Sequence, residues 1–166
     1  MNVNPERWPA PLRSLAAWLH VDFRPSGRPS GAAVVAATVV AIVGSLVADY
    51  LLVRLGTAVF PSTKGYGHFQ FSDYAKLTII GVIIAGIAWP VVARVTSQPR
   101  WLFLRSAVVV TIVLFAPDVW IWHGGAPAKA VFVLIWLHVA IAIVTYNALV
   151  HVAPVRRHCR GRHARV

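Results

Sequence analysis

A few ionisable residues interrupt long apolar stretches of this chain, and they are the first candidates for chemistry. Asp49 lies in the stretch that opens at Gly31, Asp118 follows Pro117 near the end of a later stretch, and His138 lies near the middle of the last one. An ionisable side chain in such surroundings is costly unless it is paired, so it often marks a functional site. Three further candidates lie near the ends of the stretches: Arg54, His123 and Lys129.

Two uses of these charges are open. Asp49 and Asp118 could pair with Arg54 or Lys129 and hold helices together, which is the commoner role of such residues. Alternatively, these groups could line a polar pocket. His138 could be a neutral ring bonded to a neighbouring helix, or part of a proton relay.

The segment of residues 61–72, PSTKGYGHFQFS, could close such a pocket. Its glycines would allow it to fold over the ends of the helices like a lid, and otherwise it would rest on lipid headgroups. The lid candidates are its aromatic and imidazole side chains: Tyr66, His68, Phe69 and Phe71.

Other kinds of reactive site lack their sequence signatures. A metal site of His123, His138, Asp49 and Asp118 has no HxxxH or HxxE spacing to support it. There is no nucleophile elbow and no glycine-rich phosphate loop. Cys159 is the only cysteine, which excludes a disulfide framework or CxxC redox chemistry within one chain. We therefore expect no catalytic residue, no metal and no cofactor.

The candidates must be positioned by membrane-spanning helices. The chain is 58% hydrophobic and 13% charged, whereas soluble domains carry about a quarter charged residues. Its apolar residues form four continuous blocks, each long enough to cross the ~30 Å hydrocarbon layer as a helix. A barrel would instead need short alternating segments. The sequence predicts an all-α bundle of four transmembrane helices, at about 31–60, 73–96, 100–122 and 127–153.

Small residues and tryptophans predict how these helices pack. Small residues on one face of each favour contact between the first two helices, because small side chains let helices approach closely. The first helix has Ala33, Ala37 and Ala41 at four-residue spacing, continued by Gly44 and Ala48, and the second has Gly81 and Ala85 at the same spacing, then Gly86. Four tryptophans are expected in the interfacial aromatic belts: Trp89, Trp101, Trp120 and Trp122.

The charge distribution predicts orientation. A net charge of +11 would suggest nucleic acid as a partner of a soluble protein. Here, however, 12 of the 16 Lys and Arg residues flank the helices on one side. Arginine-rich flanks stay in the cytoplasm, so both termini are predicted to be cytoplasmic.

Two terminal segments complete the organisation. Residues 1–30 are expected to hold an interfacial amphipathic helix, with Leu12, Leu15 and Leu19 at helical spacing, followed by a Pro/Gly linker. Residues 154–166 form a basic tail that favours anionic lipid over RNA. The arginines expected to contact lipid are Arg156, Arg157, Arg160, Arg162 and Arg165.

The part from the second to the fourth helix resembles a family of small four-helix membrane proteins from actinobacteria. The resemblance rests on a small-residue helix, an arginine-rich turn, a proline near the end of the third helix and a histidine in the fourth. The matching positions are Gly81, Gly86, Trp89, Arg94, Arg100, Pro117 and His138. The resemblance implies a four-helix protein of the bacterial plasma membrane. It does not indicate an activity.

Three functions remain open. The first is a non-enzymatic accessory or scaffold protein, because no catalytic constellation is left once spanning, packing and anchoring are accounted for. The second is a small carrier or proton-coupled transporter that works through Asp49, Asp118 and His138 in an outward-facing polar pocket. The third is a membrane enzyme acting on a lipid or quinone. The expected partners are the lipid bilayer and a membrane protein or a second copy of the chain, with no nucleic acid.

Overall fold

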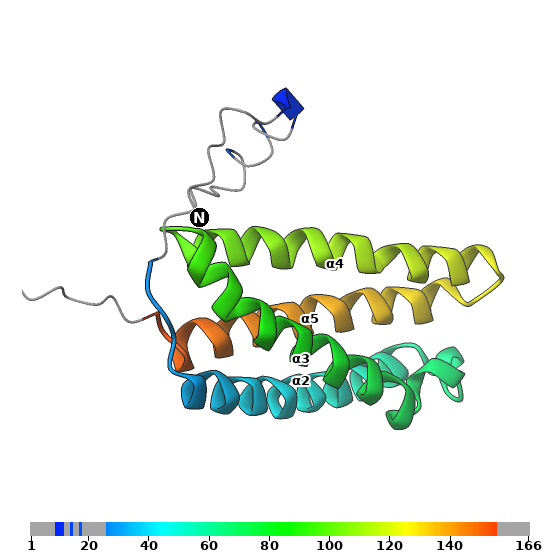
Figure 1. Cartoon of the computed structure of the whole chain (residues 1–166). Coiled ribbons are helices and arrows are strands. Elements are labelled where there is room, and N and C mark those ends of the chain that lie inside the picture. Colours follow the sequence, from blue (N-terminus) through cyan, green and yellow to red (C-terminus); the bar gives the residue numbers. More distant parts are fainter. Residues whose placement is uncertain (1–8, 12–13, 15–16, 18–25, 156–166) are drawn as a thin grey trace, which may run out of the picture.

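The computed structural model describes residues 9–11, 14, 17 and 26–155, and the described chain is all-α (Figure 1). The predicted fold class is confirmed. Two short 3-10 helices, η2 (Pro61–Thr63) and η3 (Gly67–Phe69), lie between the first two long helices. The long helices are α2 (Gly31–Val59), α3 (Phe71–Val95), α4 (Pro99–His123) and α5 (Ala128–Val152).

All four long helices can cross a membrane. Each has 25 or 29 residues, so each is about 38–44 Å long at 1.5 Å per residue. Large apolar side chains cover their outward surfaces, for example Leu77 on α3 and Val113 on α4, which are 74% and 63% exposed. Such surfaces are stable in lipid and not in water. The chain is therefore a multi-pass membrane protein in contact with the bilayer.

The helices pack in a fixed order. α5 lies between α2 and α4, and α3 crosses the bundle against α2 (Figure 1). Residues 60–70 and 124–127 connect helices at one end, here called the loop end. Residues 26–30, 96–98 and 153–155 lie at the opposite end, here called the terminal end (Figure 1). Segments that enter and leave the bundle are thus on the same side.

Small residues set these contacts, although not only where predicted. A Cβ on Gly86 of α3 would collide with Thr38 of α2, and Ala41 packs against Val82, so the predicted contact of these helices is confirmed. Gly44 was predicted to face the same neighbour, but it faces α5 instead, where a Cβ would lie 3.0 Å from Val144. A long helix has several faces, and α2 uses its small residues on two of them.

Trp89 is not part of an aromatic belt. It is 1% exposed, its Nε1 atom donates a 2.8 Å hydrogen bond to the carbonyl oxygen of Ala153, and its ring packs edge-on against Phe103. The belt prediction fails here because this indole finds a backbone acceptor inside the protein. The other three tryptophans are exposed, as a belt requires: Trp101, Trp120 and Trp122.

The two terminal predictions lie mostly outside the described residues. These include the interfacial leucines (Leu12, Leu15 and Leu19) and the lipid-binding arginines (Arg156, Arg157, Arg160, Arg162 and Arg165). At the terminal end the described chain begins with Ser26, whose backbone N–H and Oγ atom both donate to the carbonyl oxygen of Ala93.

Candidate functional site

Asp49 is buried inside the bundle. Small and polar residues recur every four positions along α2, so one face of this helix is turned inward: Ala37, Ala41, Ser45, Asp49 and Val53. The Asp49 side chain has no solvent exposure, and its Oδ2 atom accepts a 2.7 Å hydrogen bond from Oγ1 of Thr78 on α3. Its Oδ1 atom has no hydrogen-bond partner among the described residues.

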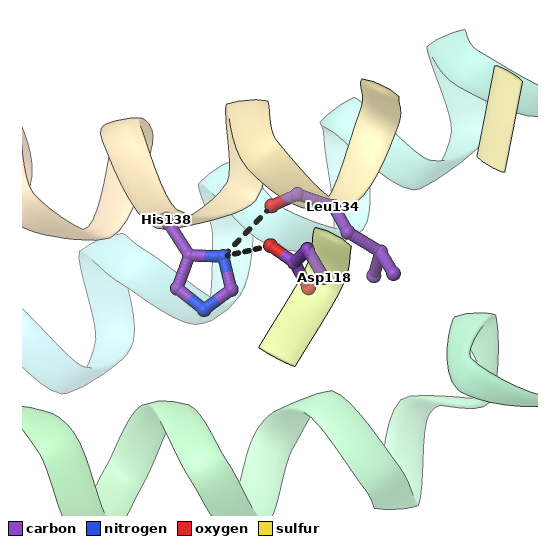
Figure 2. A network of polar contacts seen from close by, with 3 residues as sticks. All are labelled: Asp118, Leu134 and His138. Carbon is purple, nitrogen blue, oxygen red and sulfur yellow. Dashed lines mark hydrogen bonds and ion pairs between the residues drawn. The ribbon is translucent and has the colours of Figure 1, made fainter. Parts of the chain in front are cut away.

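The imidazole of His138 on α5 lies beside Asp118 of α4 (Figure 2). Its Nδ1 atom is 3.2 Å from Oδ2 of Asp118 and 3.0 Å from the carbonyl oxygen of Leu134. One N–H group cannot be aligned with both the Leu134 carbonyl and the Asp118 carboxylate. Oδ2 of Asp118 therefore accepts no hydrogen bond from the described residues. The Asp118–His138 contact is therefore an ion pair when the imidazole carries its proton. The second ring nitrogen, Nε2, points away from both acceptors (Figure 2).

Three ionisable groups from three helices form one cluster, which we call the acid–imidazole cluster: Asp49, Asp118 and His138. Asp49 is close enough to His138 for their charges to interact. Asp49 and His138 each lie ten residues from the loop end of their helices, or about 15 Å along the axis. Asp118 is five residues from that end, at about 8 Å. The cluster therefore extends from near the loop end toward the middle of the bundle.

Two buried hydroxyl residues lie on the helices that carry Asp49 and His138, and neither was among the predicted site residues. Ser45 on α2 and Thr145 on α5 are buried, and their hydroxyl oxygens have no partner among the described residues. Ser45 precedes Asp49 by one helical turn, so both occupy the same face. That spacing was a usable signal. Thr78, the single threonine of α3, gave none, because the sequence does not show which face of α3 is turned toward Asp49.

The lid candidates lie in different places. Tyr66 and Phe69 pack edge to face over a hydrophobic cluster to which all four long helices contribute. Burial, followed by the negative charge of Asp118, raises the pKa of the Tyr66 hydroxyl, which places this ring near the acid–imidazole cluster. His68 is exposed and touches the edge of Tyr66. Phe71 is exposed as well and contacts Tyr74.

The predicted pairing of the carboxylates with Arg54 or Lys129 is wrong. The ion pair of the described chain joins Asp118 to His138. The Nζ atom of Lys129 instead lies 5.6 Å from the centroid of the Phe60 ring, and the Arg54 guanidinium lies 6.0 Å from that of Tyr50. Both cations are on the exposed surface, whereas the carboxylates face the interior.

His123 also lies apart from the cluster. It is exposed at the end of α4, where its ring contacts that of Trp122. Within the described residues, no group of three His, Cys, Asp or Glu side chains could hold a metal ion. The acid–imidazole cluster can instead bind a proton, since a carboxylate and an imidazole both accept one and no Lys or Arg of the described residues forms an ion pair with either carboxylate.

Comparison with known proteins gives one match. The model of a family described as "Family of unknown function (DUF6069)" matches residues 22–154, which covers all four long helices. No curated protein and no solved structure matches the chain.

Proposed function

The chain belongs to the DUF6069 family, and we propose that it is a small proton-coupled membrane carrier whose acid–imidazole cluster takes up and releases the proton. One observation carries the proposal. Asp49, Asp118 and His138 come from three helices and lie together inside a membrane-spanning bundle, without a Lys or Arg partner in the described part of the chain. Ionisable groups placed in this way mark proton relays in pumps and transporters.

The arrangement suits a group that changes charge. A protonated His138 is stabilised by its contact with Asp118 and by the nearby charge of Asp49, whereas a neutral ring leaves both buried carboxylates without this compensating charge. Loading the cluster with one proton therefore changes the electrostatic energy that joins α2, α4 and α5. A carrier needs such a link between occupancy and helix packing, because a ligand shifts a conformational equilibrium only through differential binding.

Proton entry can be measured without a cargo. Vesicles containing the purified protein are adsorbed on a sensor electrode and exposed to a rapid pH jump. A proton that moves into the bundle displaces charge and gives a transient current. We expect this current for the wild type, and its loss in Asp49→Asn and His138→Gln. Asp73→Asn is the matched control, since Asp73 is an exposed carboxylate in the first turn of α3.

Two results would reject the carrier: a wild-type current no larger than that of protein-free vesicles, or equal currents in the wild type and in Asp49→Asn.

An accessory or scaffold role is the second candidate, and the exposure of α4 favours it. This helix buries only four of its residues within the described bundle, namely Pro99, Leu102, Phe103 and Asp118. Its apolar outer surface could receive a helix of another membrane protein instead of lipid. Co-purification in mild detergent, followed by identification of the bound proteins, tests this role. Purification of the chain without any bound protein would remove the support for an accessory or scaffold role.

The proposed location is the plasma membrane of a bacterium, specifically an actinobacterium, with both termini in the cytoplasm. The terminal end of the bundle carries Arg28, Arg94, Arg100 and Arg105, and the arginine-rich terminal sequences follow from this end. The loop end carries four basic residues: Arg54, Lys64, Lys76 and Lys129. This asymmetry supports a cytoplasmic terminal end.

A further inference from the structure

A hollow of about 440 Å³ lies at the loop end, outside the acid–imidazole cluster. The last turns of α2, the connection between α2 and α3, and the first turn of α3 form its walls. Five of its eleven lining residues are aromatic, and two are cations, Arg54 and Lys64. The aromatic lining residues are Tyr50, Tyr66, Phe69, Phe71 and Tyr74.

The charge of this hollow is positive and uncompensated. No Asp or Glu is among its lining residues, and neither Arg54 nor Lys64 forms an ion pair within residues 26–155. Arg54 lies over the ring of Tyr50, so its alkyl stem and guanidinium are partly fixed in place. Two cations in one hollow favour an anion with several oxygen atoms.

The depth of the hollow matches the headgroup boundary of a bilayer. Arg54 precedes the end of α2 by five residues, or about 8 Å along the axis, and Lys64 lies beyond that end in the connection. About one turn deeper along α2 than Arg54, Leu51 is 59% exposed and presents apolar surface to lipid chains. The cations of the hollow are thus at the level of phosphates, and the helix that carries Arg54 is apolar on its outer surface below them.

We propose that this hollow binds one anionic phospholipid of the leaflet at the loop end, with its phosphate between Arg54 and Lys64. The guanidinium fork contacts two phosphate oxygens, and the Lys64 ammonium neutralises the remaining charge. The aromatic rings cover the glycerol and the first part of the chains. The proposal does not depend on proton coupling, because the acid–imidazole cluster contributes no lining residue.

The test measures retention of single lipids by native mass spectrometry. The purified protein is titrated in detergent with phosphatidylglycerol or phosphatidylcholine that carry the same acyl chains. We expect the wild type to retain one phosphatidylglycerol in preference to phosphatidylcholine. Arg54→Gln/Lys64→Gln should bind phosphatidylglycerol about tenfold more weakly or worse, since at least one charge-assisted contact is lost. Arg94→Gln is the matched control, because Arg94 is exposed at the terminal end.

The proposal can be rejected by either of two binding results. Equal retention of both lipids by the wild type, or equal phosphatidylglycerol binding by the double variant and Arg94→Gln, would overturn the proposal. Displacement of the lipid by millimolar inorganic phosphate would overturn the lipid as occupant and identify a free phosphate instead. Asp49→Asn should retain phosphatidylglycerol normally, so a failed proton experiment leaves this result intact.

Discussion

The hydroxyl of Thr78 donates a 2.7 Å hydrogen bond to Oδ2 of Asp49 and thereby links α3 to α2 inside the bundle. Asp49 has no solvent exposure and Thr78 only 3%. This contact fixes one oxygen of the carboxylate and leaves Oδ1 without a described partner. Asp49 is thus held in position while it keeps a free site for a proton.

Removing this donor should destabilise the protein. Thr78→Val keeps the shape of the side chain but deprives a buried carboxylate of its bond, which typically costs about 1–3 kcal/mol. Thermal unfolding in detergent should show a lower Tm. Thr57→Val is the control, since the Thr57 hydroxyl bonds only to backbone carbonyls of its own helix. Equal Tm values for the two variants would contradict the assigned contact.

The partner of Asp118 can be identified by a double variant. His138→Leu leaves the buried Asp118 carboxylate without its cation and should cost about 3 kcal/mol near neutral pH. His138→Leu/Asp118→Asn should recover part of this loss, because the uncompensated charge is gone. Lys129→Gln should leave the unfolding temperature close to that of the wild type. A loss in Lys129→Gln as large as that in His138→Leu would show that lysine is the true partner.

Two glycines of α3 provide a test of helix packing. In Gly86→Ala the new methyl group meets Thr38, whose Oγ1, Cγ2 and Cβ atoms are all close, so rotation of the threonine gives no room. We expect a loss of about 1–3 kcal/mol in stability from overpacking. Gly81→Ala faces open space and should be neutral or slightly stabilising, since alanine favours helix. Equal effects would mean that α2 and α3 do not meet at Gly86.

Reporter fusions can determine the orientation of the helices in the membrane. An enzyme that works only in the cytoplasm should be active when fused after Val166. A reporter that works only outside should be active when inserted at Gly65, which is exposed in the connection between α2 and α3. The inverse pattern at either position would overturn the proposed topology.

The sequence predicted the helices well because membrane crossing constrains both length and composition. It also singled out Asp49, Asp118 and His138, since ionisable residues are rare in such helices. Their partners could not be predicted from proximity along the chain. Asp118 and Lys129 flank one short turn, yet the carboxylate faces α5 while the lysine lies at the exposed start of that helix.

Thr78 was missed for a different reason. Serine and threonine in a helix usually bond to a carbonyl of their own preceding turn, as Thr38 and Thr111 do here. A threonine with such a bond needs no tertiary partner, so the presence of Thr78 in the sequence did not indicate one. Thr78 departs from this habit only because Asp49 of a neighbouring helix lies within reach. The bundle geometry decides this, and it depends on contacts between distant residues.

The proposed carrier requires the acid–imidazole cluster to change its protonation state. Infrared difference spectra of the protein in lipid, recorded between about pH 5 and about pH 8, detect the C=O stretch of carboxyl groups as they gain a proton. We predict a carboxyl band from the bundle interior that is lost in Asp49→Asn and kept in Asp73→Asn. The same carboxyl band in the wild type and in Asp49→Asn would contradict the account.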